Sequence, residues 1–185
     1  MAKKIKKIRK DRGMSISELS KSAGVNKKLI KEIEEGNILP SLSPLIKISR
    51  ALGVRLGTFL DDEIQEGPII VRKGKSSKVM HFSGEEDRVD KSHLEFHSLG
   101  MGKADRHMEP FVIYVDLPPK NFKLSSHEGE EFIYVLNGEI EVIYGKNKYR
   151  LSEGDSIYYD SIVPHHVHSA GNKPAKILAV LYTPF

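Results

Sequence analysis

The chain has 185 residues, of which 39% are hydrophobic and 29% charged, proportions that are ordinary for a globular protein. It contains no cysteine, which excludes a disulfide framework, a zinc–thiolate site and a thiol nucleophile. No apolar run is long enough to cross a membrane, and the basic N-terminus lacks the apolar segment of a signal peptide. The expected location is therefore the cytoplasm, with no membrane partner.

The net charge of +4 is unevenly distributed along the chain. Residues 1–60 hold 14 Lys and Arg against 5 Asp and Glu, a net charge of +9, whereas the remainder holds 15 against 20, a net charge of −5. A small basic region joined to a mildly acidic one predicts a polyanion-binding module attached to a different domain.

The first two predicted helices lie in the basic region and have clear ends. The first carries an apolar stripe and ends at Gly13. Ser15 and Glu18 have the spacing of a capping box, which marks the start of the second helix. Gly24 then marks its end.

Three further helices complete the predicted helical domain, residues 1–62. Asn26 caps the third helix, which ends at Gly36. A fourth is expected to begin at Ser43-Pro44, with the proline in the first helical position, and to end at Gly53. A short fifth helix covers about residues 56–60.

The second and third helices and the short turn between them form a helix-turn-helix layout. Together with Ile33-Glu34-x-Gly36 and Pro40-Ser41-Leu42, this region resembles the phage-repressor-like (XRE, Cro/CI-type) DNA-binding domain. The resemblance implies that the start of the third helix enters the major groove of double-stranded DNA. Ile16 departs from the family, which often has a glutamine there that contacts the DNA backbone.

The resemblance also implies which side chains contact DNA. Lysine can pair with guanine, and glutamate can accept a hydrogen bond from cytosine. We expect base contacts from Asn26, Lys27, Lys28 and Glu32, and phosphate contacts from Lys31 and Asn37. The alternative is a helical bundle that does not bind DNA, which the charge of +9 disfavours.

Residues 63–75 are predicted to form a linker and a first strand, with the strand at residues 69–72. Residues 76–185 are predicted to form an all-β barrel or jelly roll, because short β-rich segments alternate there with turn signals. The fold class is thus α + β with two domains. The expected strands of the second domain are residues 94–99, 111–117, 122–125, 132–136, 140–144, 156–159, 165–168 and 177–182.

Three residues in the β domain have the character of a metal site. His127 and Glu131 lie four residues apart across Gly129, and His165 follows Val163-Pro164. Two imidazoles and a carboxylate can form a three-ligand face for a divalent metal. We expect His127 to end one strand and Glu131 to begin the next, with the glycine reversing the chain. The alternative is a polar interior without a metal.

These residues and their spacing resemble the two motifs of the cupin family. His127, Glu131 and Gly138 match the first motif, and Gly154-Asp155 and His165 match the second. The order of the two domains resembles the XRE–cupin regulators. Where cupins have a further histidine this chain has Ser125, so the resemblance implies three protein ligands and open positions on a divalent metal (Fe, Zn, Mn or Ni), an arrangement suited to non-haem Fe(II).

The same order of domains also resembles hydroxypropylphosphonate epoxidase, a mononuclear non-haem iron enzyme family. That family shares the serine two residues before the first ligand histidine. Arg88 aligns with an arginine of the family, but Leu94 and Phe96 stand where it has tyrosines, and Gly13 stands where it has a lysine. The departures leave the family's phosphonate substrate without its usual partners.

We therefore expect a transcriptional regulator that binds DNA as a homodimer or higher homo-oligomer and a small effector in the barrel. An iron oxidoreductase is the main alternative, and a metal-dependent isomerase or a sugar-binding cupin is a third. The expected effector pocket contains Arg88, Phe96, Ser125 and Tyr158.

The remaining histidines have no ligand spacing in the sequence. We expect His166 and His168 to alternate away from the metal site and to face solvent or a sheet edge, because they follow His165 on a predicted strand. A bulge in that strand would instead bring His168 into the site. The others are expected at the surface or rim of the barrel, namely His81, His93, His97 and His107.

Overall fold

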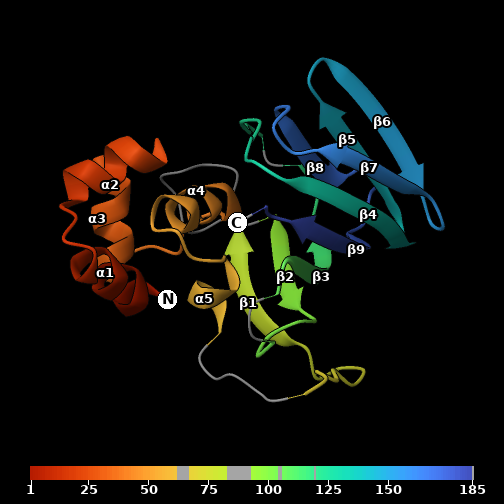
Figure 1. Cartoon of the computed structure of the whole chain (residues 1–185). Helices are drawn as coiled ribbons and strands as arrows, with labels where there is room; N and C mark the ends of the chain where they lie inside the picture. The colour runs from red at the N-terminus through yellow and green to blue at the C-terminus, as the bar shows by residue number, and fades with distance from the viewer. Residues whose placement is uncertain (62–66, 83–92, 104–105, 119, 185) are drawn as a thin grey trace.

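The computed structural model describes residues 1–61, 67–82, 93–103, 106–118 and 120–184, with the backbone alone for residues 77–82. Within these ranges five helices are followed by nine strands. Figure 1 shows the helices on one side of the molecule and the strands on the other, with α4 and α5 nearest to the strands. We call residues 1–61 the helical region and residues 77–184 the β region.

The helices begin and end close to the predicted positions. Ser15 accepts a hydrogen bond from the backbone N–H of Glu18, whose carboxylate accepts one from the Ser15 N–H, so the predicted capping box is present. Gly24 and Gly36 end their helices in the left-handed conformation. The helices are α1 (Ala2–Asp11), α2 (Ile16–Ala23), α3 (Lys27–Glu35), α4 (Leu42–Ala51) and α5 (Gly57–Leu60).

The predicted start of α4 was wrong by two residues. The helix begins at Leu42, after the N-cap residue Ser41, so Pro44 occupies the third helical position and not the first. Proline is tolerated there because the backbone N–H groups of the first turn have no partner within the helix. Ser41, the N-cap residue, is partly buried, and its side chain makes no capping hydrogen bond.

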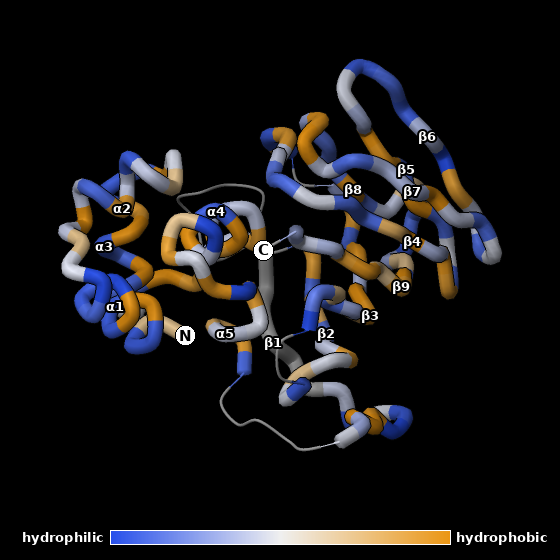
Figure 2. The backbone as a smooth tube through the Cα atoms, viewed as in Figure 1, coloured by the Kyte–Doolittle hydropathy of each residue, from blue (hydrophilic) through white to orange (hydrophobic). Residues whose placement is uncertain are grey.

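Apolar residues of all five helices are buried and belong to the hydrophobic core, and Figure 2 shows the apolar positions along the backbone in orange. One buried ion pair crosses this core. Arg9 of α1 donates two hydrogen bonds to the carboxylate of Glu34 in α3, at 2.6 and 2.7 Å. A third goes to the carbonyl oxygen of Met14. Glu34, part of the motif seen in the sequence, therefore fixes α1 against α3.

Two antiparallel sheets form the β region. The six-stranded sheet has the order β1-β2-β3-β9-β4-β7, and the three-stranded sheet has the order β6-β5-β8. Their facing sides hold the buried residues of alternate strand positions. The strands are β1 (Ser77–Phe82), β2 (Leu94–Ser98), β3 (Met108–Val115), β4 (Glu130–Asn137), β5 (Glu139–Tyr144), β6 (Asn147–Ser152), β7 (Ser156–Asp160), β8 (His165–Ser169) and β9 (Ala175–Tyr182).

Three strand predictions were wrong. Residues 69–72 are not in a strand, and the first strand is β1. Residues 122–125 contribute only an isolated bridge between Ser125 and His165. Strand β6 was missed because only Leu151 among its six residues is buried, so its sequence shows no apolar alternation. It is held by pairing with β5.

A buried ion-pair cluster joins the helical region to the β region. Arg106, just before β3, pairs with Asp61 at the end of the helical region and with Glu109 of β3, the latter at 2.7 Å. Burial raises the pKa of Glu109 to about 7, against the opposing effect of the Arg106 charge. The guanidinium lies directly against Gly57 of α5, where an added Cβ atom would come within 2.9 Å of Arg106 Cζ.

Replacing Arg106 with methionine is expected to lower the free energy of unfolding by about 3 kcal/mol, because two largely buried carboxylates would lose their cation. Thermal unfolding followed by circular dichroism measures this loss. The matched control is Arg150→Met, which removes an exposed pair with Glu139 and is expected to cost less than about 1 kcal/mol. Equal effects of the two substitutions would contradict the role given to Arg106.

Candidate metal and DNA-binding sites

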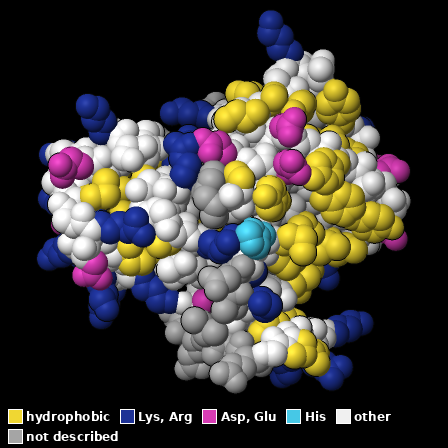
Figure 3. All heavy atoms as spheres, viewed as in Figure 1, with side chains coloured by type: hydrophobic (Ala, Val, Ile, Leu, Met, Phe, Trp, Pro, Cys, Tyr) yellow, Lys and Arg dark blue, Asp and Glu magenta, His cyan; other side chains and the backbone are white. Residues whose placement is uncertain are grey.

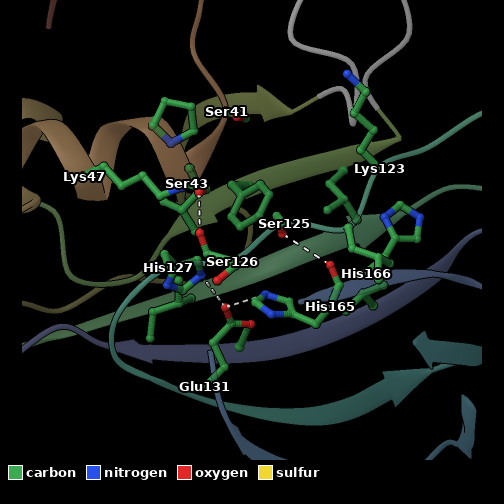
Figure 4. A pocket seen from close by; sticks show the side chains of 18 of the residues that line it. Ser41, Ser43, Lys47, Lys123, Ser125, Ser126, His127, Glu131, His165 and His166 are labelled. Atoms are coloured by element: carbon green, nitrogen blue, oxygen red, sulfur yellow. Dashed lines mark hydrogen bonds and ion pairs between the residues drawn. The ribbon is translucent and has the colours of Figure 1, made fainter. Parts of the chain in front are cut away.

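Two of the three predicted metal ligands are placed by strands that enclose the core. Glu131 is the second residue of β4 and points inward, in register with Tyr159 of β7 and Leu181 of β9. His165 is the first residue of β8. Both side chains are buried, and they converge from the two sheets (Figure 4).

The third predicted ligand, His127, lies in the loop before β4 and does not end a strand as expected. Its N–H donates to the carbonyl oxygen of Ser161 at 3.0 Å, which holds the loop against the chain before β8. Gly129 makes this path feasible, since its φ is +115° and an added Cβ atom would lie 2.0 Å from the carbonyl oxygen of Tyr182. The backbone of β9 leaves no room for a side chain there.

The three ligand atoms lie within 4.8 Å of one another. Glu131 Oε1 is 2.8 Å from His127 Nε2 and 3.4 Å from His165 Nε2. The Nδ1 atoms lie 3.2 and 2.9 Å from the carbonyl oxygens of Glu128 and Val163, to which an Nδ1–H can donate. With the protons on Nδ1, the lone pairs of both Nε2 atoms face the carboxylate, so a proton or a metal cation is needed between them.

The electrostatics of the cluster are consistent with a shared positive charge. Burial opposes ionisation of Glu131, but hydrogen bonds with His127 and His165 hold its pKa below the ordinary value. Burial also opposes a charge on His165, and its contact with Glu131 raises the pKa of the imidazole. The donor set therefore fits a divalent metal in a buried site.

Tyr159, and not the predicted Tyr158, reaches this cluster. Tyr159 is buried, and its hydroxyl donates to Glu131 Oε2 at 2.7 Å. The Ser161 hydroxyl lies 3.3 Å from Oε1. Tyr158 is 63% exposed and bonds to Glu130 on the outer face, so its assignment to the effector pocket was wrong. The alternation of β7 decides which of the two tyrosines points inward.

A pocket of about 460 Å³ lies above the cluster and is lined by both regions (Figure 4). Phe96 and Ser125 line it, as predicted, whereas Arg88 lies outside the described residues. The helical region also lines the pocket. Its contribution to the lining consists of Gly24, Val25, Asn26, Ser41, Leu42, Ser43, Pro44 and Lys47.

Helix α4 also holds the loop that carries His127. The Ser43 hydroxyl donates to the carbonyl oxygen of Ser126 at 2.8 Å. Arg50 forms an ion pair with Glu128. These two contacts flank His127 on either side in the sequence, so the position of α4 is tied to that of a candidate metal ligand.

His93, His166 and His168 are all buried, so the expectation that they face solvent was wrong. Strand β8 does lie at the edge of its sheet, and His93 lines the pocket. The ring of Phe122 stacks on His166 with centroids 4.0 Å apart and also lies near His168. Burial lowers the pKa of His166 to about 3, which keeps the imidazole neutral. A segment remote in sequence covers this side of β8, so strand alternation alone did not reveal it.

The other predicted surface histidines differ in their surroundings. His97 is partly buried, and its Nε2 lies 2.7 Å from Glu95 Oε1. His107 is exposed, and its Nδ1 lies 2.8 Å from Arg55 Nη1, a further contact between the two regions. His81 is in β1, and its side chain lies outside the described residues.

The predicted DNA-contacting residues lie on α3 or directly beside it, and Figure 1 shows α3 on the side of the helical region away from the sheets. Their exposure differs little, since all are exposed except Glu32, which is partly buried. Asn26, just before α3, also lines the pocket shared with the β region. The Asn26 side chain accepts from the Lys28 N–H at 2.8 Å, so part of it is used as the helix cap. Asn37 donates to Glu32 at 3.0 Å.

Two families match separate parts of the chain. Residues 5–59 match the helix-turn-helix family, and residues 113–181 match the cupin domain family. The chain joins an XRE-type helix-turn-helix domain to a cupin domain. The helical region is the former and the β region contains the latter. In the described part of the chain, no helix has the length and apolar character to span a membrane.

Two regulators are similar to this chain over both domains. The HTH-type transcriptional regulator PuuR of Escherichia coli (strain K12) is 25% identical over 97% of this chain and 91% of its own length. The structure of an HTH_3 family transcriptional regulator from Vibrio cholerae covers 100% of this chain and 95% of its own, with 24% identity and a TM-score of 0.69. The second likeness shows the shared fold.

An enzyme is also similar to this chain. The (S)-2-hydroxypropylphosphonic acid epoxidase of Streptomyces wedmorensis is 28% identical over 76% of this chain and 73% of its own length. A structure of FeII HppE in complex with substrate covers 98% of this chain and 97% of its own, at 26% identity and a TM-score of 0.54. The regulators and this enzyme are therefore each similar to this chain over both of its domains.

Proposed function

We propose that this protein is a DNA-binding transcriptional regulator whose cupin domain binds a small effector next to a divalent metal. The observation that carries the proposal is the placement of Lys27, Lys28 and Lys31. They are exposed on α3, and Figure 1 shows this helix farther from the strands than α4 and α5. The similarity to PuuR over both domains supports the same reading.

In this proposal α3 lies in the major groove. Lys27 and Lys28 read guanine edges, and the side-chain amide of Asn26 retains its donor for a base while its oxygen caps the helix. The carboxylate of Glu32, which Asn37 orients by a hydrogen bond, contacts a base. Lys31 and the exposed Asn37 then contact phosphates.

The metal in this proposal is held by His127, Glu131 and His165, with Tyr159 orienting the carboxylate. Fe, Zn, Mn and Ni all suit a donor set of two imidazoles and one carboxylate. Such an ion would offer open coordination positions to an oxygen or nitrogen atom of the effector. Ser125, in place of a fourth ligand, lines the pocket above it.

Effector binding is proposed to alter the position of the helix-turn-helix domain through α4. The pocket lies between α4 and the metal-site loop, and the Ser43–Ser126 and Arg50–Glu128 contacts join the two. A ligand that fits one arrangement of this joint better than another shifts the balance between them. DNA affinity then changes by the same coupling free energy.

The proposed oligomer is a homodimer, in which each copy reads one half-site about 10 base pairs from the other, or a multiple of that distance. Figure 3 shows apolar side chains gathered over β4, β7 and β9. They include the exposed Tyr134, Tyr158 and Tyr182. An apolar patch of this kind is a suitable surface for a second copy.

Sedimentation of the free protein tests whether it is a dimer, and a monomer at micromolar concentration would contradict the proposed homodimer.

An iron oxidoreductase is the second candidate, favoured by the likeness to the epoxidase and by the three-ligand cluster. Against it, the pocket wall carries the apolar Leu94 and Phe96 where the sequence comparison with that enzyme family expects tyrosines. Oxygen consumption by iron-loaded protein together with absence of DNA binding would favour the enzyme.

Replacing both Lys27 and Lys28 with alanine is expected to weaken binding to the correct DNA site at least about tenfold, because each base contact contributes roughly 1–3 kcal/mol. Fluorescence anisotropy measures affinity for duplex DNA from the region upstream of the protein's own gene, over a series of salt concentrations. Affinity of the wild type is expected to fall steeply as salt rises.

The control for this experiment is Lys146→Ala, since Lys146 is exposed in the turn between β5 and β6, far from α3. It is expected to bind DNA like the wild type. The regulator proposal fails if the wild type does not bind duplex DNA even at low salt. The base-contact assignment fails if the double substitution leaves affinity unchanged.

Replacing Glu131 with glutamine is expected to lower metal affinity at least about tenfold, since it removes the only anionic ligand, and Tyr159→Phe is expected to lower it about tenfold or more by releasing the carboxylate. Elemental analysis of purified protein and calorimetric titration with Zn²⁺ measure both effects. Glu130→Gln is the matched control, because Glu130 bonds to Tyr158 on the outer face. Equal metal content in all variants would contradict the site.

A further inference from the structure

We infer that the effector is a small carboxylate, held by Lys47 of α4 and by Lys123 on the cupin side of the pocket. This inference rests on the proposed function, because it names the class of ligand that the shared pocket accepts. It depends on the charges, hydrogen-bonding groups and apolar surface of the described residues that line the pocket.

The charged groups of the pocket favour an anion. Among the described lining residues, the permanently charged groups are Lys47, Lys123 and Glu131. Glu131 is already bound by two histidines, Tyr159 and Ser161. A cationic ligand such as an amine would therefore find no free carboxylate among these residues, and the two lysines would repel it. A metal ion at the cluster would add further positive charge.

The two lysines have no ion-pair partner among the described residues, so their charges are available to a ligand. Lys47 is half-buried and Lys123 is exposed. Figure 4 shows Lys47 on the α4 side of the pocket beside Ser43, and Lys123 above Ser125 with its ammonium group pointing away from the triad. A carboxylate that contacted both lysines would be bound by groups from both domains.

Two further groups suit a carboxylate. His166 lines the pocket, is 7% exposed, and has no hydrogen-bond partner for its Nε2 within the described structure. The first turn of α4 also borders the pocket, and the Ser41 side chain does not cap it, so backbone N–H groups there lack a side-chain acceptor. Together these groups offer hydrogen-bonding capacity that a carboxylate can use.

The rest of the pocket wall is apolar, which favours a ligand whose uncharged part is also apolar. The apolar residues that line the pocket include Phe96, Ile113, Ile133 and Leu181. The volume of about 460 Å³ lies within the range of small-molecule sites. A short hydrocarbon chain bearing one or two carboxylates would place its apolar part against this wall and its charge toward Lys47.

The test uses full-length protein and four probes, namely acetate, succinate, inorganic phosphate and butane-1,4-diamine, which matches succinate in carbon number with the opposite charge. Calorimetry and the thermal unfolding midpoint report binding. We expect succinate to bind and to raise the midpoint. Lys47→Gln is expected to weaken succinate binding about tenfold or more, and Lys47→Arg to restore part of it. Lys146→Gln is the control and is expected to bind like the wild type.

Binding of the diamine without either carboxylate overturns the inference, and so does a lack of response to both carboxylates up to about 10 mM. Binding of phosphate alone overturns the assignment of a carboxylate. Unchanged succinate affinity in Lys47→Gln overturns the role of α4. Duplex DNA binding measured on the same samples separates the two proposals. DNA binding without carboxylate binding supports the regulator and contradicts the carboxylate inference. Carboxylate binding without DNA binding supports the ligand site and contradicts the regulator.

Discussion

The structure depends on one short loop, residues 125–129, which is held from both sides. On the inner side, Gly129 passes so close to the Tyr182 carbonyl that no side chain fits, and the His127 backbone bonds to Ser161. On the outer side, α4 binds the carbonyl of Ser126 and pairs with Glu128. The loop therefore presents His127 to the cupin interior while its neighbours contact the helix-turn-helix domain.

This arrangement provides the route by which, in the proposed regulator, a buried site in the cupin domain would act on DNA binding. The triad brings two imidazole lone pairs and a carboxylate to one point, which favours a cation there. The pocket above it has one wall from α4, so a ligand bound there would contact both domains at once. The Arg106 cluster joins the two domains at a second place. The inter-domain contacts that a ligand can change are therefore those on the pocket side.

Features set by neighbouring residues could be predicted from the sequence. The capping box at Ser15 and Glu18 and the metal-ligand spacing of His127 and Glu131 are of this kind. Features set by tertiary packing could not. The burial of His166 comes from stacking with Phe122, the inward position of Tyr159 from the register of β7, and the shared pocket from the docking of α4.

The most direct test of the account compares DNA affinity with and without a saturating divalent metal, in the wild type and in the double variant Ser43→Ala, Glu128→Gln. The account predicts that metal changes the affinity of the wild type by at least about fivefold. The variant should still bind both metal and DNA, but without that change, because its loop is released from α4. A metal effect of equal size in the variant, or none in the wild type, would contradict the account.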